Sequence, residues 1–190
     1  MCGIIGVVSK KGFSTNDMLQ MLKRLEYRGY DSFGFASSDG YIEKHVGEIG
    51  KFDGSKNMEM KSGIAHTRWS THGPPTKENA HPHSDCKGEL VVAHNGIIEN
   101  YKELKQELIK KGHVFKSETD TEVIAHYFEE KLKKGKPIEE AANEFFDDIK
   151  GTFAVLLMRT GKDKIYALKR NSPLVLGITD NRLILASDIY

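Results

Sequence analysis

Short apolar runs separated by turn residues fill much of this chain, and they constrain its fold more than any other feature. Such runs open the sequence at residues 3–9 and follow one another from residue 152 to residue 186. Tight turns separate them, as at residues 160–163 and 179–181. Because connections this short join antiparallel neighbours, whereas parallel strands need a crossover of a dozen or more residues, the pattern predicts antiparallel sheets.

Amphipathic segments between the strands predict helices that need a sheet face to cover. Apolar residues recur at helical spacing in four segments, which are residues 15–27, 100–111, 119–134 and 137–150. Asn100 with Glu103, and Thr119 with Glu122, have the spacing of a capping box. The sequence therefore predicts an α+β fold, with one domain over residues 2–190.

The charge balance and the apolar content exclude two classes of partner. The 28 Lys and Arg residues against 27 Asp and Glu residues leave a net charge of +1, too small an excess to coat nucleic acid. No apolar run approaches the ~18–20 residues of a membrane span, and the N-terminus lacks a secretion leader. Two cysteines, Cys2 and Cys86, suit a reducing compartment. We therefore expect a cytoplasmic protein that binds neither nucleic acid nor membrane.

Cys2 is the first candidate for chemistry, because it directly follows the initial methionine. Removal of Met1 would place its thiol beside a free α-amine, whose pKa of ~7.7–8.0 leaves it partly neutral and able to act as a base. A free thiol has a pKa near ~8.5, so at neutral pH it needs such a base. A cysteine at position 2 is also often plain leader sequence, and both interpretations stay open at this point.

A loop dense in functional side chains runs over residues 65–73. Arg68 could hold a carboxylate through its forked guanidinium, and Trp69 beside it could cover a pocket. The same residues also suit a surface loop in which the arginine meets solvent or a structural carboxylate. The loop alone does not separate these two interpretations.

Asn95 and Gly96 follow an apolar strand at residues 90–94 and also admit two interpretations. The common one is a turn, which this dipeptide favours. The other is an oxyanion hole, in which the Asn95 amide and the Gly96 N–H point at one developing negative oxygen. Asp120 likewise suits either the first turn of a helix or the binding of a substrate ammonium.

The histidines raise the question of a metal site. His81 and His83 form one HxH motif with Cys86 nearby. Other histidines that could join them are His66, His72 and His94. A structural zinc site usually shows two ligand pairs at tight spacing, and no second pair is visible in this stretch. We therefore expect neither a metal nor another cofactor.

Several motifs, in order along the chain, resemble one family. They are Met1-Cys2-Gly3-Ile4 and residues 25–32, 66–73, 79–83, 94–100, 117–126, 172–175 and 186–188. This arrangement is similar to the glutaminase domain of class II glutamine amidotransferases, which are N-terminal nucleophile hydrolases. Within that family the likeness is strongest to the glutamine–fructose-6-phosphate aminotransferases. The resemblance implies a four-layer αββα sandwich of two mainly antiparallel sheets flanked by helices.

The resemblance also implies a role for each matching residue. Cys2 matches the catalytic nucleophile, with its own α-amine as the base, and Asn95 and Gly96 match the oxyanion hole. Arg68 matches the residue that binds the α-carboxylate of L-glutamine, and Asp120 the one that binds its α-ammonium. The implied reaction is hydrolysis of the glutamine side-chain amide through a γ-glutamyl thioester, which releases glutamate and ammonia.

Four further residues match the surroundings of that site. Trp69, Thr71 and His72 match a loop that covers the substrate. Arg28 matches an arginine that orders the site around the N-terminus.

The family's synthases continue into sugar-phosphate isomerase domains that have no counterpart in these 190 residues. The resemblance thus implies that ammonia formed here serves the synthesis of glucosamine 6-phosphate from fructose 6-phosphate in those domains, in cis or on a separate subunit, with a homodimeric full-length enzyme. Three alternatives stay open. They are the glutaminase domain of another amidotransferase, a silent glutamine-binding or interaction module if Met1 is retained, and a zinc-binding structural domain.

Overall fold

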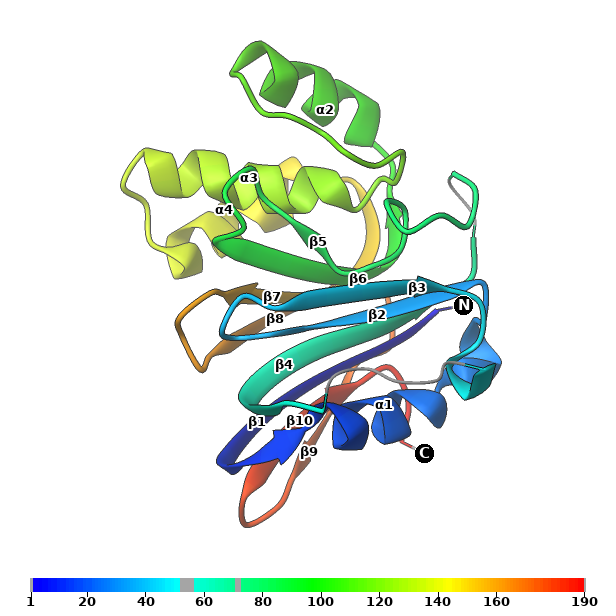
Figure 1. Cartoon of the computed structure of the whole chain (residues 1–190). Coiled ribbons are helices and arrows are strands. Elements are labelled where there is room, and N and C mark those ends of the chain that lie inside the picture. Colours follow the sequence, from blue (N-terminus) through cyan, green and yellow to red (C-terminus); the bar gives the residue numbers. More distant parts are fainter. Residues whose placement is uncertain (1, 52–56, 71–72, 190) are drawn as a thin grey trace.

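Two antiparallel sheets form the centre of the molecule, as the short connections predict. The computed structural model describes residues 2–51, 57–70 and 73–189 (Figure 1). The larger sheet has the order β3-β2-β4-β1-β10-β9 and contains β1 (Gly3–Ser14), β2 (Ser32–Ser37), β3 (Ile42–Val46), β4 (Glu59–Arg68), β9 (Val175–Ile178) and β10 (Arg182–Ala186). The smaller sheet has the order β5-β6-β7-β8 and contains β5 (His83–Ser84), β6 (Leu90–Ile98), β7 (Gly151–Arg159) and β8 (Ile165–Arg170). Neighbouring strands are antiparallel in both sheets.

Helices cover the outer face of each sheet, which gives the four layers that the resemblance implies (Figure 1). The helices are α1 (Thr15–Lys23), α2 (Tyr101–Lys110), α3 (Glu122–Lys133) and α4 (Ile138–Asp148). The helix α1 packs on the six-stranded sheet, and the other three lie beyond the four-stranded sheet. Two short 3-10 turns, Glu26–Arg28 and Ile49–Lys51, complete the regular structure. In the part of the chain described, no helix is long and apolar enough to cross a membrane.

Both faces of the central strands are apolar, and this feature creates three separate hydrophobic cores. In β1, Ile4 lies in the core between the two sheets, whereas Ile5 packs in the core beneath α1. In β6, Val91 lies between the sheets, and Val92 packs against the helices on the other side. Successive side chains of a strand point to opposite faces, so a strand that is apolar at every position must be covered twice. The sandwich satisfies that requirement.

The two sheets meet where the chain begins. Gly3 of β1 pairs with Thr67 near the end of β4, and Ser32 of β2 pairs with Arg68. Cys2 and the residues after Arg68 therefore lie together at the ends of central strands of the larger sheet. β6 of the smaller sheet lies against the same strand ends, where the His66 side chain in β4 bonds to Asn95 in β6.

The turn interpretation of Asn95 and Gly96 is wrong. Both residues lie inside β6, paired with Ala154 and Phe153 of β7. Gly96 has a φ of 125°, which side chains rarely tolerate. A Cβ there would fall on the carbonyl oxygen of Thr152, well inside van der Waals contact. The glycine thus marks a close approach of two strands.

Both predicted capping boxes are also absent. Asn100 does precede α2, but its side chain makes no capping bond and instead bonds to the backbone at the end of α4. The helix α3 begins at Glu122, later than the pairing with Thr119 requires. The Glu122 carboxylate accepts hydrogen bonds from the backbone N–H groups of Lys116 and Ser117. Tertiary contacts therefore replace the capping box at α2, and bonds to the preceding loop replace it at α3.

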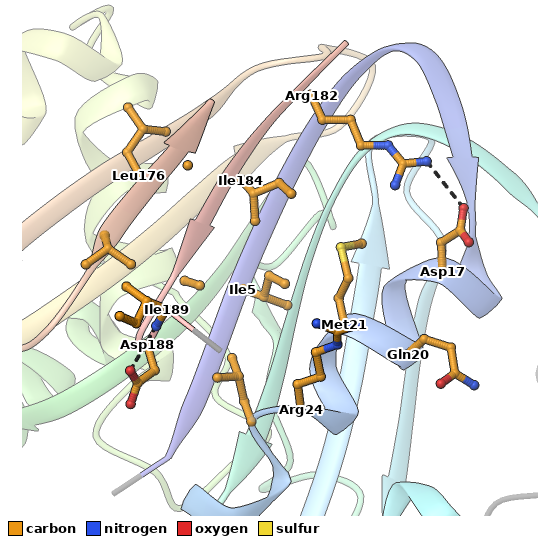
Figure 2. Close-up of a pocket in the computed structure, with 14 residues that line it drawn as sticks. Ile5, Asp17, Gln20, Met21, Arg24, Leu176, Arg182, Ile184, Asp188 and Ile189 are labelled. Atoms are coloured by element: carbon orange, nitrogen blue, oxygen red, sulfur yellow. Dashed lines mark hydrogen bonds and ion pairs between the residues drawn. The ribbon is translucent and has the colours of Figure 1, made fainter. Parts of the chain in front are cut away.

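A pocket of about 490 Å³ lies between α1 and the outer strands β9 and β10 (Figure 2). Ile5 and Ile184 contribute to its apolar lining, and an ion pair between Arg182 and Asp17 spans 3.5 Å at one side. None of the candidate site residues of the sequence is among the residues that line it. The site that they form lies elsewhere.

The contact at Gly96 yields a stability prediction. We expect Gly96→Ala to lower the free energy of unfolding by at least about 3 kcal/mol, because strain at positive φ adds to a backbone clash. Gly88→Ala is the matched control, since Gly88 also has a positive φ, 71°, but no atom lies within 4 Å of its added Cβ. Gly88→Ala should lower the free energy of unfolding by about 1 kcal/mol. Urea unfolding of both variants measures the difference, and equal losses would contradict the clash.

Candidate active site

Three hydrogen-bond donors from separate elements contact Cys2. Its Sγ accepts a hydrogen bond from the backbone N–H of Trp69 at 3.1 Å. Its carbonyl oxygen accepts one from Arg28 Nε at 3.0 Å and one from the side-chain amide of Asn95 at 2.8 Å. The N-terminal residue of the described chain is therefore held in place from the loop after β4, from the turn before β2 and from β6.

Arg28 links Cys2 to the far end of the chain. Its Nη1 lies 3.0 Å from Asp188 Oδ2, which also accepts a hydrogen bond from the Tyr27 hydroxyl at 2.5 Å. Ser187 adds a second link, because its hydroxyl accepts a hydrogen bond from the Ile4 N–H at 3.2 Å. The ordering of the N-terminus thus depends on residues more than 150 positions away.

The Asn95 side chain has a defined orientation, which a buried histidine sets. His66 Nε2 lies 3.0 Å from the carbonyl oxygen of His94 and 2.9 Å from Asn95 Oδ1. A carbonyl oxygen only accepts, so Nε2 must carry a proton and donate to both. The Asn95 amide nitrogen then points the other way, to Cys2. Burial lowers the pKa of His66 to about 3, which keeps the ring neutral in this arrangement.

This role of His66 could not be read from the sequence, which presented the residue as a candidate metal ligand and as part of the motif at residues 66–73. Its position in a strand of one sheet and that of Asn95 in the other become neighbours only through the packing of the two sheets. No local pattern signals such a contact.

Arg68 is buried and directs its guanidinium at the segment that follows it. Nη1 donates to the carbonyl oxygen of Pro74 and the hydroxyl of Ser70, both at 3.2 Å, and Nη2 donates to the carbonyl oxygen of Gly73 at 3.1 Å. These are neutral acceptors. A substrate carboxylate would be a stronger partner for the same donors, because charge-assisted hydrogen bonds are roughly twice as strong.

Asp120 lies just before α3 and not in its first turn, because Thr121 is the N-cap and the helix begins at Glu122. Its Oδ2 accepts a hydrogen bond from the N–H of Ile98 at the end of β6, at 2.8 Å. The carboxylate is almost fully buried. This contact holds Asp120 beside the strand that carries Asn95.

One small pocket brings these candidate residues together. Its lining includes Cys2, Arg68, Trp69, Asn95, Gly96 and Asp120, with His81, His94, Thr119 and Thr121. Its volume is about 30 Å³. Trp69 is half-exposed at its edge and packs edge-on against Tyr30 with 5.6 Å between ring centroids. Thr71 and His72 lie outside the described residues.

The thiol in this pocket is a weak nucleophile without help. Burial raises the pKa of Cys2, and the Trp69 N–H, Arg68 and Arg28 oppose that rise only in part. Little thiolate is therefore present at neutral pH, and reaction at Sγ requires a base close by. No side-chain carboxylate or imidazole among the described residues bonds to Sγ.

The histidines of the HxH motif do not meet Cys86. His81 stacks on His66 with 4.0 Å between ring centroids, and His83 Nε2 lies 3.1 Å from the Thr119 hydroxyl. Burial lowers the pKa of both rings well below the usual value. The motif thus belongs to the packing behind the pocket.

Comparison with known proteins identifies the family. A family model described as glutamine amidotransferase domain matches residues 66–190, which is more than half of the chain. The glutamine–fructose-6-phosphate aminotransferase (isomerizing) of Thermococcus kodakarensis is 48% identical over 196 residues, covering 100% of this chain and 32% of the relative. The corresponding protein of Methanothermobacter thermautotrophicus is 44% identical over 195 residues, covering 100% of this chain and 33% of the relative. The chain thus spans about a third of the length of these relatives.

Solved structures give the same result for the fold. The glutamine phosphoribosylpyrophosphate amidotransferase of B. subtilis, complexed with ADP and GMP, superposes with a TM-score of 0.77 at 25% identity, over 98% of this chain and 42% of that one. A structure described as the allosteric regulatory enzyme of purine biosynthesis gives 0.83 at 26% identity over the same shares. The chain therefore belongs to the glutamine amidotransferase domain family, has the fold of N-terminal nucleophile hydrolases, and shares the function of that domain, the hydrolysis of glutamine.

Proposed function

We propose that this chain hydrolyses L-glutamine to glutamate and ammonia through a thioester on Cys2. The observation that carries this mechanism is the convergence of a thiol, a side-chain amide, a guanidinium and a carboxylate on one pocket. Each supplies a different requirement of amide hydrolysis: a nucleophile, an oxyanion donor and two binding groups of opposite charge.

The reaction begins with attack of Cys2 Sγ on the carbon of the glutamine side-chain amide. The amide oxygen becomes an oxyanion, which the Asn95 amide and the Gly96 N–H stabilise. One such donor typically lowers the barrier by ~2.7–4 kcal/mol. The α-amine of Cys2 takes the thiol proton and returns it to the leaving nitrogen, so that ammonia departs as the amide C–N bond breaks. Water then cleaves the γ-glutamyl thioester to release glutamate through a second oxyanion in the same hole.

The base in this scheme is the α-amine of Cys2, which exists only after removal of Met1. The raised pKa of the Cys2 thiol makes such a base necessary. Met1 lies outside the described residues, and its removal stays a prediction. If Met1 is retained, the amide nitrogen of Cys2 cannot take a proton, and the chain binds glutamine without hydrolysing it.

The binding groups act at the other end of the substrate. Arg68 holds the α-carboxylate of glutamine in place of the backbone carbonyls it now contacts, and Asp120 holds the α-ammonium. Trp69, with Thr71 and His72, covers the bound amino acid. Arg28 and His66 are positioning residues, because the first orders Cys2 and the second orients the Asn95 amide.

Beyond glutamine hydrolysis, we propose that the ammonia serves the synthesis of glucosamine 6-phosphate from fructose 6-phosphate. The names and lengths of the relatives support this, since the matched region is about a third of isomerizing aminotransferases. The acceptor domains would follow in cis or come from a separate subunit, in a cytoplasmic homodimeric enzyme. Phosphoribosyl transfer is the second candidate, because the B. subtilis neighbour is a glutamine phosphoribosylpyrophosphate amidotransferase, although its sequence identity with the chain is only 25%.

The Cys2 mechanism makes a direct prediction. Cys2→Ala should reduce the rate of glutamate release at least about 1,000-fold, because it removes the nucleophile. A preparation with an unprocessable N-terminal extension should lose activity as well, although it keeps the thiol. Glutamate and ammonia release, measured together with the intact mass of each preparation, tests both statements. Robust glutamine hydrolysis by either preparation would contradict the proposed mechanism.

Asp120 yields a second prediction, and its hydrogen bond to Ile98 decides the choice of variant. Asp120→Asn keeps an oxygen that can accept from the Ile98 N–H but removes the charge. We expect KM for glutamine to rise at least about 10-fold, with little change in melting temperature, because a charge-assisted contact contributes about 1.5–3 kcal/mol. A lowered melting temperature with KM unchanged would mean that Asp120 has a structural role only.

A further inference from the structure

Four side chains outside the active site converge at the middle of α3. Cys86 lies in the turn between β5 and β6, and His113 follows the end of α2. His126 and Glu129 project from α3 three residues apart. One ligand atom from each lies within 4.8 Å of all the others, and the two imidazoles and the carboxylate are buried.

The spacing of these atoms is that of a tetrahedral metal site. Cys86 Sγ lies 3.6 Å from His126 Nδ1 and 3.9 Å from His113 Nδ1. Glu129 Oε2 lies 2.8 Å from His113 Nδ1 and 3.1 Å from His126 Nδ1. Zinc bonds of ~2.0–2.3 Å in tetrahedral geometry separate neighbouring ligands by ~3.3–3.6 Å. The four distances bracket this range, and no two of the ligand atoms lie more than 4.8 Å apart, so rearrangement of the side chains by up to about 1 Å would admit the ion.

The surroundings of both imidazoles fit the same interpretation. Each ring has its other nitrogen facing a carboxylate: His113 Nε2 lies 3.3 Å from Glu130 Oε2, and His126 Nε2 lies 3.6 Å from Glu122 Oε1. A carboxylate in that position keeps Nε2 protonated and leaves the Nδ1 lone pair for a metal. The buried Nε2 of His126 has no hydrogen bond in the described structure, although Glu122 is close. Coordination at Nδ1 would fix the ring and its tautomer.

Other contacts orient the Cys86 sulfur and the Glu129 carboxylate for binding a metal. The N–H of Val114 donates to Cys86 Sγ at 3.4 Å, which orients the sulfur toward the two imidazoles. Lys133 Nζ lies 2.9 Å from Glu129 Oε1, which leaves Oε2 directed at the two histidines. A thiolate and a carboxylate together cancel the charge of a divalent ion. Cys86 is exposed, and it provides the path by which an ion could enter.

We propose that Cys86, His113, His126 and Glu129 bind one Zn²⁺ ion as a closed structural site. One sulfur, two imidazoles and one carboxylate suit zinc better than magnesium or calcium, which prefer oxygen ligands alone. The proposal departs from the metal-free expectation of the sequence, which looked for partners of Cys86 in the HxH motif and not on α3.

The site would steady the segment that carries Asp120. Zinc joins the turn at Cys86, the end of α2 and α3, and Glu122 of α3 anchors the backbone N–H groups of Lys116 and Ser117. Asp120 lies between that anchor and the start of the helix. Zinc binding does not depend on Cys2, so it can be tested whatever the outcome of the glutaminase assay.

Metal analysis of the tag-free chain tests the proposal. We expect about one equivalent of zinc after dialysis, and a Co²⁺-substituted sample should show a thiolate-to-metal charge-transfer band. Cys86→Ala should weaken zinc affinity at least about 100-fold in competition with a chromophoric chelator and abolish the band. His45→Ala, which alters a histidine paired with Glu43 outside the cluster, and Cys2→Ala should both bind zinc as the wild type does.

Stability supplies an independent measurement that does not depend on a single variant. Chelation should lower the melting temperature of the wild type but not that of Cys86→Ala. Because the Cys86 side chain is exposed, its truncation should leave the chain able to fold. Two results would overturn the proposal. One is a wild-type chain that binds neither Zn²⁺ nor Co²⁺ in titration, which would make the cluster a hydrogen-bonded network. The other is a Cys86→Ala variant with unchanged zinc affinity.

Discussion

The hydrogen bond from His66 Nε2 to Asn95 Oδ1 is the contact on which the candidate active site depends. It spans the two sheets, and it determines which end of the Asn95 amide faces Cys2. The neutral state of His66 follows from burial, since its pKa falls to about 3. A donor held in this way needs no reorganisation when negative charge develops next to it, which is the main source of catalysis by such groups. In the proposed mechanism, the packing of the two sheets therefore supplies one preorganised amide donor, that of Asn95.

The packing of the two sheets explains why the site forms at the ends of strands from both of them. The first residues of β1 are buried on both faces and paired with β4, so Cys2, which directly precedes Gly3, is placed by a well-packed strand. Arg28, which is itself paired with Asp188, then donates to the Cys2 carbonyl from outside the sheets. Sites supported by strands keep their geometry better than sites on loops. The proposed zinc ion would give the Asp120 segment, which follows a loop, comparable support.

Much of this arrangement could be predicted from the sequence, and the failures share one cause. Short connections predicted antiparallel sheets, and helical periodicity predicted all four helices, because both depend on nearby residues. The interpretation of Asn95 and Gly96 as a turn was wrong, because pairing with β7 overrides the turn preference of this dipeptide. The roles of His66 and of the Cys86 cluster depend on residues 29 and 40 positions apart. Only tertiary packing brings such residues together, so local sequence patterns do not predict these contacts.

A double-mutant cycle in kcat for glutamine hydrolysis tests most directly whether His66 acts through Asn95. The variants are His66→Leu, Asn95→Ala and the double variant, with melting temperatures recorded for each. If His66 serves only to orient the Asn95 amide, the double variant should have the kcat of Asn95→Ala alone, while His66→Leu lowers kcat at least about 10-fold. If the two losses multiply in the double variant, His66 acts independently of Asn95, and the account is contradicted.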